Sequence, residues 1–346
     1  MRILFAGHFE WNCGSTQVVK EYVDAGTMLG IEICLSDVSH IDRVTAKHLP
    51  VVDSLRNTDI LVFVLEGAQF IDRYRLLRCQ KEVPRGHRIV IDTDGHNREL
   101  TREGSDANHY STEEFFTWRE LFSELSDIIL EPSAVTTNAG TQFLYFGMSH
   151  QLTHASSIQT EWDLGYIGNN WYRWKDFVWL LQEIREVRHL IPRVAIRGMW
   201  WDQESLYGFP GAEEATFSDP ILLSEHDVRL GPSVEFGSVV ASMSKARVHP
   251  ILARPILRHM HFVTPRMFET FASNAIPVLA PYLEYTTALY GDECRPLILN
   301  DKPAEQLAKM VIEPQYFQDL SLHIRNKLRC EHSYEKRIEE LLYFVE

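Results

Sequence analysis

Residues 264–269 (TPRMFE) combine an arginine and a glutamate with the signals that begin a helix. Thr264 is a good N-cap and Pro265 suits the first helical position, so a helix is expected to begin here. The beginning of a helix presents unpaired N–H groups, and Arg266 adds a planar cation that matches a phosphate. Glu269, one turn further on, can accept two hydrogen bonds from neighbouring hydroxyls. A phosphate next to vicinal hydroxyls is the pattern of a nucleotide.

Two carboxylates and a histidine lie at 92–97 (DTDGHN), at the end of the apolar run 88–92. Asp92 and Asp94 could hold a divalent metal ion through hard oxygen ligands. The letters IVIDTDG also resemble the DxDG nucleophile motif of haloacid-dehalogenase-type phosphatases, although that motif usually follows the first strand. Asp94 or His96 could instead act as a general base. Aspartates that only cap the loop, without any chemistry, are a further interpretation.

The loop 7–16 (GHFEWNCGST) joins the first expected strand to the first expected helix. Glycines near both ends allow a tight backbone path, and Ser15 or Thr16 can cap the helix. Together with Gly14, these residues would leave free N–H groups for the phosphate of a ligand or for an acceptor. The loop does not match GxGxxG, so a plain strand-to-helix turn is the alternative.

The elements that must position these loops alternate along the first half of the chain. Helical patterns near 16–28, 69–81 and 112–125 separate short apolar runs, and a helix-compatible stretch follows the second run to about residue 56. The runs typical of buried strands are 2–6, 31–35, 59–65, 88–92, 127–131 and 141–147. This alternation predicts a parallel sheet with helices on both faces. Ligands of such sheets bind beyond the carboxyl ends of the strands, where both loops lie.

A second alternating series begins at 162–168 (WDLGYIG) and predicts a second domain of the same kind. Its expected elements are a helix near 173–188, a strand at 193–199, a helix and a strand within 237–252, and a strand at 276–279. We therefore predict an α/β fold of two Rossmann-like domains. The predicted bounds are 1–155 for the first domain, 156–330 for the second, and 331–346 for a C-terminal helix.

Composition and charge limit the possible partners. Lys plus Arg number 34 and Asp plus Glu number 48, which gives a formal net charge of −14, so binding to nucleic acid is not expected. The five cysteines are scattered without a CxxC pair, and no third ligand accompanies His259 and His261, so no metal site is expected. The sequence shows neither a signal-peptide pattern nor an apolar run long enough to cross a membrane, which predicts a cytoplasmic protein.

Several segments of the second half resemble one family, in the right order and spacing. The run 266–280 (RMFETFASNAIPVLA) resembles the R-x-FE-x-x-A-x-G-x-x-x-L segment of GT-B glycosyltransferases, in the group-1 branch that includes spore-coat CgeB-like proteins. Residues 166–181 resemble the first strand, loop and helix of their donor domain, 331–342 their closing helix, and 142–150 the segment that enters the donor domain. The resemblance spans most of 142–346 and is only architectural before that.

The resemblance implies that the two Rossmann-like domains face each other across a cleft. It also implies an enzyme that moves a hexose-type sugar from a nucleotide-diphosphate donor to a hydroxyl of an unknown acceptor. Glu269 matches the glutamate that holds the donor ribose, and Arg266 would lie beside the phosphates. Gly168 matches the glycine after the first strand of the donor domain, and Arg173 or Lys175 would supply a cation for the diphosphate. The donor is a co-substrate, and neither a cofactor nor an obligatory metal ion is implied.

Two positions depart from the family pattern. The first glutamate of the E-x7-E pattern falls at His261, which could still hydrogen-bond a sugar hydroxyl or a phosphate, and Asn274 replaces the usual glycine. If the enzyme inverts the sugar configuration, it needs a base in the first domain, for which Asp94, His96 and His8 are the candidates. If it retains the configuration, these residues would orient the acceptor. The closing helix would pack back on the first domain.

Three other functions compete with this one. A metal-dependent phosphatase would use Asp92 and Asp94 and would lose its activity with a chelator. A non-catalytic GT-B relative would bind a nucleotide without turning over a donor. A nucleotide-sugar epimerase would form its product without an acceptor.

Aromatic residues are a further feature of the second half. Four tryptophans flank the expected cleft: Trp171, Trp174, Trp200 and Trp201. Their rings could stack on a sugar or a base, and packing in the core or between the domains is the alternative.

Overall fold

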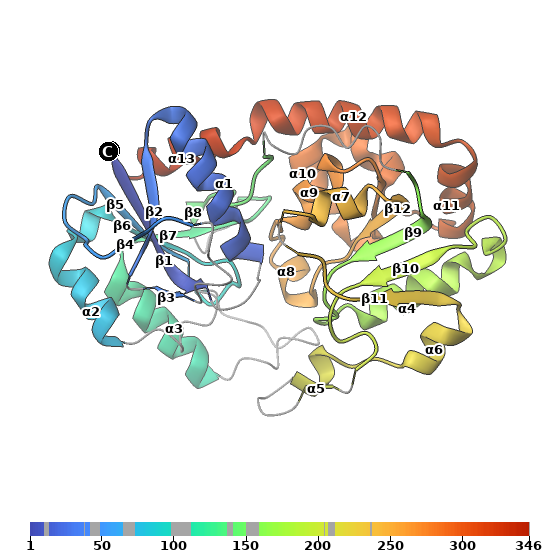
Figure 1. Cartoon of the computed structure of the whole chain (residues 1–346), viewed down its shortest axis with the longest axis horizontal. Coiled ribbons are helices and arrows are strands. Elements are labelled where there is room, and N and C mark those ends of the chain that lie inside the picture. Colours follow the sequence, from blue (N-terminus) through green and yellow to red (C-terminus); the bar gives the residue numbers. More distant parts are fainter. Residues whose placement is uncertain are drawn as a thin grey trace.

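The computed structural model describes residues 1–9, 14–37, 39–41, 49–64, 73–97, 112–136, 141–149, 159–203, 205–206, 212–235 and 237–345. These residues form two parallel β-sheets, each accompanied by helices, which lie side by side in the molecule (Figure 1). The first sheet ends at Gln142 and the second begins at Trp162. The predicted α/β class with two Rossmann-like sheets is confirmed.

The first sheet has the strand order β4-β2-β1-β5-β6-β7-β8, the short β3 pairs with β1, and the pairings are parallel. Strands are added on one side of β1 up to β4 and on its other side from β5, which creates a switch point of the kind that binds ligands. The strands are β1 (Arg2–Phe9), β2 (Glu32–Ser36), β3 (His40–Ile41), β4 (Val51–Val52), β5 (Ile60–Val64), β6 (Arg88–Ile91), β7 (Ile128–Glu131) and β8 (Thr141–Gln142).

Neighbouring side chains of the first sheet enter two different cores. Ile3 and Phe5 of β1 pack with α1, whereas Leu4 packs with residues of α2 and α3. Because side chains of a strand alternate between two faces, a strand that is apolar throughout must be covered on both sides. This explains why continuous apolar runs predicted a sheet between helices. The helices are α1 (Gly14–Leu29), α2 (Arg73–Glu82), η2 (Arg85–His87) and α3 (Thr112–Leu125).

Two stretches differ from the sequence prediction. The helix-compatible stretch that ends near residue 56 contains β3 and β4 in its described part, and residues 42–48 lie outside the described chain. The strand expected at 141–147 ends at Gln142, although Tyr145 and Phe146 after it are buried in the core. Burial without sheet pairing leaves the same apolar pattern as a buried strand, so the sequence could not distinguish the two.

The second sheet has the parallel order β11-β10-β9-β12-β13, with its switch point between β9 and β12. Its strands are β9 (Trp162–Ile167), β10 (Val194–Arg197), β11 (Val228–Gly231), β12 (Ala246–Ile251) and β13 (Ile276–Leu279). Its helices are α4 (Trp174–Glu183), η4 (Ile184–Val187), α5 (Ala212–Ala215), α6 (Pro220–Glu225), α7 (Val239–Met243), α8 (Pro255–His259), α9 (Arg266–Ala272), η5 (Pro281–Thr286), α10 (Thr287–Tyr290), η6 (Asp292–Leu297) and α11 (Pro303–Ile312).

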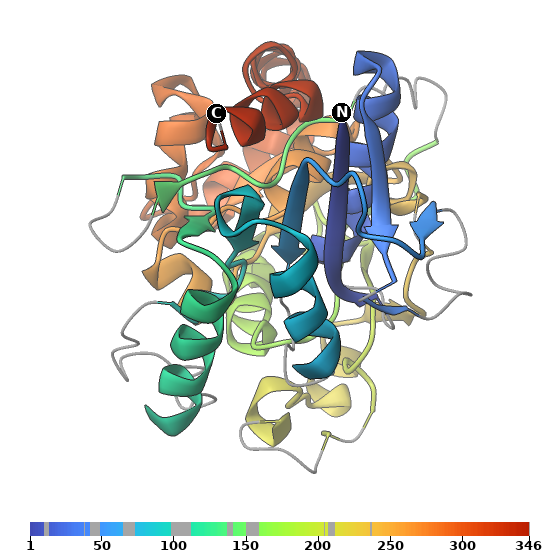
Figure 2. The same ribbon diagram turned by 90° about the vertical axis from the view of Figure 1, so that its left-hand side faces the viewer.

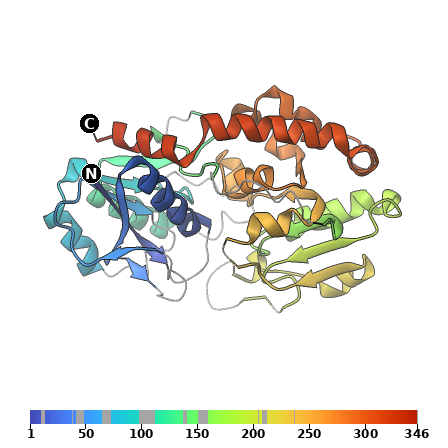
Figure 3. The ribbon, with the colours of Figure 1, turned by 45° about the horizontal axis from the view of Figure 1, so that its top comes forward.

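The last two helices connect the halves. They are α12 (Pro314–Glu331) and α13 (Tyr334–Tyr343), and Figure 3 shows them as one red segment along the top of both halves. α13 packs against α1, where the ring centroids of Tyr22 and Tyr334 lie 5.2 Å apart. Figure 2 shows both chain ends at the same end of the first half. One buried core therefore runs from the first sheet into the second half, and the domain boundary predicted near residue 155 lies outside the described residues.

Candidate functional site

Helix α9 brings the predicted arginine and glutamate together at its first turn. Arg266 Nη1 lies 2.5 Å from Glu269 Oε2, and the two side chains are 23% and 18% exposed. The helix begins one residue later than the sequence predicted, because Pro265 and not Thr264 is the N-cap residue. Thr264 contributes its carbonyl oxygen, which accepts the N–H of Met267. Arg266 and Glu269 still lie in the first turn of the helix, so they can form the expected ion pair.

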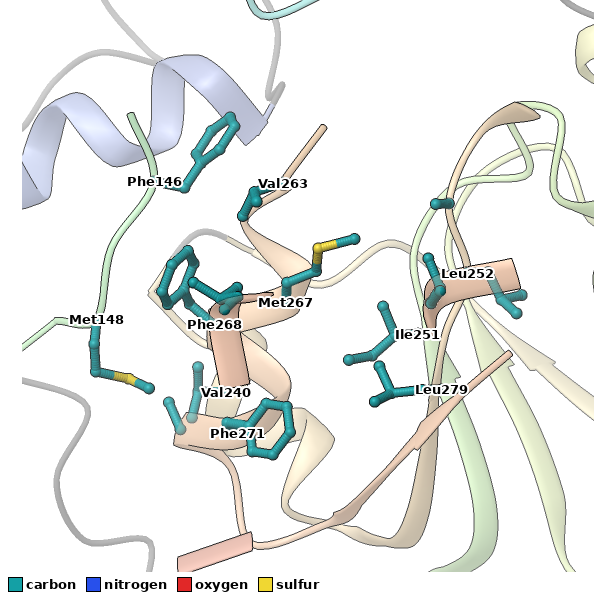
Figure 4. Packing of buried hydrophobic residues seen from close by; sticks show 14 of the residues in the cluster. Phe146, Met148, Val240, Ile251, Leu252, Val263, Met267, Phe268, Phe271 and Leu279 are labelled. Atoms are coloured by element: carbon teal, nitrogen blue, oxygen red, sulfur yellow. The ribbon is translucent and has the colours of Figure 1, made fainter. Parts of the chain in front are cut away.

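The other face of α9 is buried, and this fixes the direction of the ion pair. Met267, Phe268 and Phe271 are at most 1% exposed. Figure 4 shows Phe146 and Met148, from the first half of the chain, on one side of this helix, and residues of β12 and β13 on the other. The helix thus packs against both halves, and its two charged residues lie on its partly exposed face.

The N-terminus of α1 meets the N-terminus of α9. A Cβ atom on Gly14 would lie 2.9 Å from Cγ of Pro265, so a larger residue would force the two helices apart. This contact places Gly14, the first residue of α1, next to the charged turn of α9. Three of the predicted side chains lie outside what the structure describes: His8, Ser15 and Thr16.

The carboxyl end of β9 contributes a second arginine. A Cβ atom on Gly168 would lie 2.7 Å from the Tyr166 hydroxyl, so glycine fits there best. The guanidinium of Arg173 donates to the carbonyl oxygen of Trp171 at 2.8 Å and to the Tyr166 hydroxyl. Burial raises the pKa of Tyr166, and the charges of Arg173 and Arg266 oppose this shift. Both arginines therefore lie near one phenol.

Lys175 lies away from this group. Its side chain is 80% exposed, and its ammonium lies 3.8 Å from a carboxylate oxygen of Glu214 in α5. The sequence left Arg173 and Lys175 as alternatives for the cation at the diphosphate. The geometry favours Arg173, because its guanidinium is held by the backbone of the loop after β9.

His249 is a residue that the sequence analysis did not select. It is fully buried in β12, and its Nε2 accepts the N–H of Ile167 in β9 at 3.1 Å. Burial, together with the charge of Arg266, lowers the pKa of His249 to about 3. A neutral imidazole therefore joins the two strands at the switch point. The sequence did contain a signal for this residue, namely a histidine inside an otherwise apolar strand. A polar group that is buried in this way needs a hydrogen-bond partner.

Asp92 anchors the loop after β6 from inside. Its buried carboxylate accepts the N–H groups of Gly95 and His96 on Oδ1 and that of Asn97 on Oδ2, over 2.7–3.0 Å. Burial raises the pKa of Asp92 to about 7, and the hydrogen bonds from the loop oppose this shift. A nucleophile needs an accessible oxygen, so the arrangement does not support a phosphatase that uses Asp92. Loop capping is the correct interpretation of this residue.

Asp94, in contrast, faces the second half of the molecule. Its Oδ1 lies 3.0 Å from Nη1 of Arg254, and the side chains are 16% and 12% exposed. Arg254 follows β12, so this ion pair joins the carboxyl ends of the two sheets. His96 is 3% exposed, and its ring lies 6.5 Å from that of Phe122 in α3. Among the predicted base candidates with described side chains, the one at the interface is Asp94.

His261 also lies at the contact between the halves. Its carbonyl oxygen accepts the N–H of Ala134, and its ring stacks on Tyr285 with centroids 4.8 Å apart. Its φ of 56° is in the left-handed region, so the backbone here is constrained. Phe262 continues the contact through a bridge to Ser133. The bond from His261 to a sugar or a phosphate stays a prediction.

Two features are absent from the described residues. No group of three or more His, Cys, Asp or Glu side chains among them could hold a metal ion. No helix in the described part of the chain is long and apolar enough to span a membrane.

Solved structures share this arrangement of two sheets over nearly their whole length. An α-glucosyltransferase in complex with UDP has 12% identity, covers 99% of this chain and 100% of its own, and gives a TM-score of 0.64. An α-glucosyltransferase with UDP and a 13-mer DNA containing an HMU base has 14% identity, coverage of 100% and 99%, and a TM-score of 0.65. The T4 phage β-glucosyltransferase has 12% identity, 100% coverage of both chains, and a TM-score of 0.57.

At these identities the likeness defines the fold, which is GT-B, with two Rossmann-like domains that face each other. Residues 173–343 match the family described as "Glycosyl transferase-like", and this segment contains Arg173, Arg266 and Glu269. This segment, the second half of the chain, therefore matches a family of glycosyltransferases, as the resemblance implied. No curated protein matches the sequence.

Proposed function

We propose that the protein transfers a hexose from a UDP-hexose to an acceptor hydroxyl, without an obligatory metal ion. The observation that carries this proposal is the Arg266–Glu269 pair on the partly exposed face of α9, with Arg173 nearby. UDP is the nucleotide of the glucosyltransferase structures with this fold, and glucose is the sugar that they transfer.

The donor chemistry follows from charge and hydrogen bonding. Glu269 accepts hydrogen bonds from the two ribose hydroxyls, while Arg266 and Arg173 bind the diphosphate. Both arginines then stabilise the negative charge that develops on the diphosphate when the bond to the sugar breaks. Gly168 leaves the backbone after β9 free to approach the phosphates. His249 stays neutral and adds no competing charge next to Arg266.

On the acceptor side, the proposal assigns the contact with the reacting hydroxyl to Asp94. It lies at the interface of the halves and is partly exposed, whereas His96 is buried. If the enzyme inverts, Asp94 takes the proton of the hydroxyl as a general base, and Asp94→Asn should lower kcat by roughly 10²–10⁴-fold with UDP binding unchanged. If it retains, Asp94 orients the acceptor, and the same substitution should raise KM for the acceptor.

A thermal-shift panel tests the donor site. UDP, GDP, TDP, CDP and ADP are each added with and without EDTA, and ligand binding to the folded state raises the melting temperature. We expect a shift with UDP that EDTA does not change and that Glu269→Gln removes. Glu305→Gln is the matched control, because Glu305 forms the same kind of i,i+3 ion pair, with Lys302, on an exposed helix.

Each other outcome has a definite meaning. A shift with a different diphosphate would correct the base, and a shift that requires added magnesium would contradict metal independence. No shift with any diphosphate would count against the donor site itself. Product formed from UDP-hexose without any acceptor would favour the epimerase.

A further inference from the structure

The loops after β9 and β10 form an aromatic surface next to the proposed donor site. The ring centroids of Trp171 and Trp200 lie 5.6 Å apart, and both residues are half-buried. Phe217, which is 49% exposed, packs edge-on against Trp174 at 5.9 Å. We call these four residues the aromatic platform. The neighbouring Trp201 belongs to the core instead, because it is buried and donates its indole N–H to the Gly168 carbonyl.

Two asparagines hold the aromatic platform in place. Asn169 Oδ1 accepts the N–H of Met199 at 3.0 Å. The buried Asn170 donates from Nδ2 to the carbonyl oxygens of Trp200, at 2.9 Å, and of Phe217, at 2.6 Å. The loop after β9 is thus tied to both segments that carry the other rings. The backbone segments that carry Trp171, Trp200 and Phe217 are therefore held in fixed positions relative to one another.

The backbone of the aromatic platform adopts a costly conformation to display these rings. Trp200 has a φ of 63° and Tyr172, next to Trp171, has a φ of 56°. Bulky residues rarely occupy this left-handed region, and such residues cost on the order of 1–3 kcal/mol each and concentrate at ligand sites. At this bend of the chain Trp200 is half-buried, whereas the next residue, Trp201, is buried in the core.

The aromatic platform borders the proposed reaction centre. The carbonyl oxygen of Trp171 is the acceptor that holds the guanidinium of Arg173. In Figure 1, α5, which precedes Phe217, lies at the bottom of the molecule between α3 of the first half and α6 of the second.

The charge around the aromatic platform selects among acceptors. The described residues between 198 and 219 include four carboxylates and no lysine or arginine: Asp202, Glu213, Glu214 and Asp219. Lys175 lies beside this segment, but it pairs with Glu214. Arg173 adds one positive charge beside Trp171, so the net charge near the rings is negative, which raises the cost of bringing a nucleic acid or an anionic lipid close.

From these observations we propose that the aromatic platform is the acceptor subsite and that it binds an uncharged carbohydrate. This deepens the proposed function and rests on it. The C–H faces of a sugar ring cover aromatic rings well, and carboxylates at the rim accept hydrogen bonds from its hydroxyls. The platform thus favours a neutral saccharide over a DNA acceptor.

Calorimetric titration with four neutral tetrasaccharides, in the presence of UDP, tests the subsite. The probes are cellotetraose, maltotetraose, laminaritetraose and chitotetraose, with a short duplex DNA as the charged probe. We expect binding of at least one tetrasaccharide and none of DNA. Trp200→Asn should weaken the binding at least tenfold, because asparagine tolerates the left-handed backbone but offers no ring. Trp171→Ala should have a similar effect.

Trp179→Phe is the matched control, since Trp179 lies in α4 and packs against the core outside the aromatic platform. The UDP-induced rise in melting temperature, measured on the same samples, reports the donor site and the fold separately. The proposal is overturned if no tetrasaccharide binds, if the platform variants bind like the wild type, or if DNA binds instead. Saccharide binding that depends on Trp200, without any response to UDP, would keep the subsite and refute the donor assignment.

Discussion

The carboxylates of Asp92 and Glu269 lie in different halves of the molecule and have different roles. Asp92 directly follows strand β6, whereas Glu269 lies in the first turn of helix α9. Asp92 is fully buried and accepts three backbone N–H groups from its own loop. Glu269 is 18% exposed and pairs with the side chain of Arg266. A carboxylate saturated by backbone donors holds a loop, whereas one paired with a movable side chain can exchange that partner for a ligand.

The same contrast separates the neighbours of these residues. Asp94, two residues after Asp92, reaches across to Arg254 in the other half. His96, four residues after Asp92, is buried in the first half. Residue type and position after a strand therefore do not identify a functional group, and the direction of each side chain does.

The largest expected effect is on the exposed pair. Arg266→Ala should lower kcat/KM for hexose transfer by roughly 10²–10³-fold, because a preorganised cation at the leaving diphosphate is lost. Steady-state assays of UDP-glucose turnover measure this. Lys302→Ala, in the exposed helical pair with Glu305, is the control and should leave the rate unchanged. An unchanged rate in the Arg266 variant would mean that the pair of Arg266 and Glu269 takes no part in the reaction and, like Asp92, only supports the fold.

For the buried carboxylate of Asp92, we expect a loss of stability and no loss of UDP binding. Asp92→Ala should lower the free energy of unfolding by about 3 kcal/mol, since three N–H groups, two of them buried, lose their acceptor at roughly 1 kcal/mol each. Urea denaturation measures the loss, and the thermal shift with UDP should keep its size. A variant with wild-type stability and no UDP response would reverse the assignment of the two carboxylates.

Lowering the pH should reduce the contribution of the buried His249, in the second half of the molecule, to the free energy of unfolding. The folded-state pKa of His249 is about 3, below its value near 6.5 in the unfolded chain, so only the unfolded state takes up the proton between these values. Its contribution to stability is present above pH 6.5 and is lost as the pH falls, by about 2 kcal/mol between pH 7 and pH 5.

The measurement compares wild type with His249→Gln, whose amide oxygen can still accept the Ile167 N–H. Asp92 has a raised pKa and changes stability in the opposite direction, but it is present in both proteins and cancels in the difference. We expect the variant to lose less stability than the wild type from pH 7 to pH 5. Equal slopes in the two proteins would show that His249 is protonated in the folded state.

The smallest effect is expected for the contact between the halves. Arg254→Ala should destabilise the protein by about 1–2 kcal/mol, because its pair with Asp94 is mostly shielded from water. Lys302→Ala breaks a pair in which both side chains are more than 60% exposed and should cost about 0–1 kcal/mol. If the two substitutions cost the same in urea denaturation, the ion pair does not hold the halves together.

Much of the fold was predictable because it depends on local patterns. Apolar runs such as 59–65 predicted strands that are covered on both faces, and β5 is buried at every position. The prediction was wrong where a residue is buried without belonging to a strand, as at Tyr145. It was also wrong where a strand has only two residues, as in β4. Neither feature leaves a period that a sequence pattern can show.

By itself, the sequence determined the two alternating series and the spacing that joins Arg266 to Glu269, because strand burial and an i,i+3 pair are properties of neighbouring residues. Only the tertiary structure decided which of the other candidates meet. The contact of Gly14 with Pro265, the pair of Asp94 and Arg254, and the bond between Ile167 and His249 join residues 82 or more positions apart. Such contacts arise from the packing of whole elements, and no short stretch of sequence specifies them.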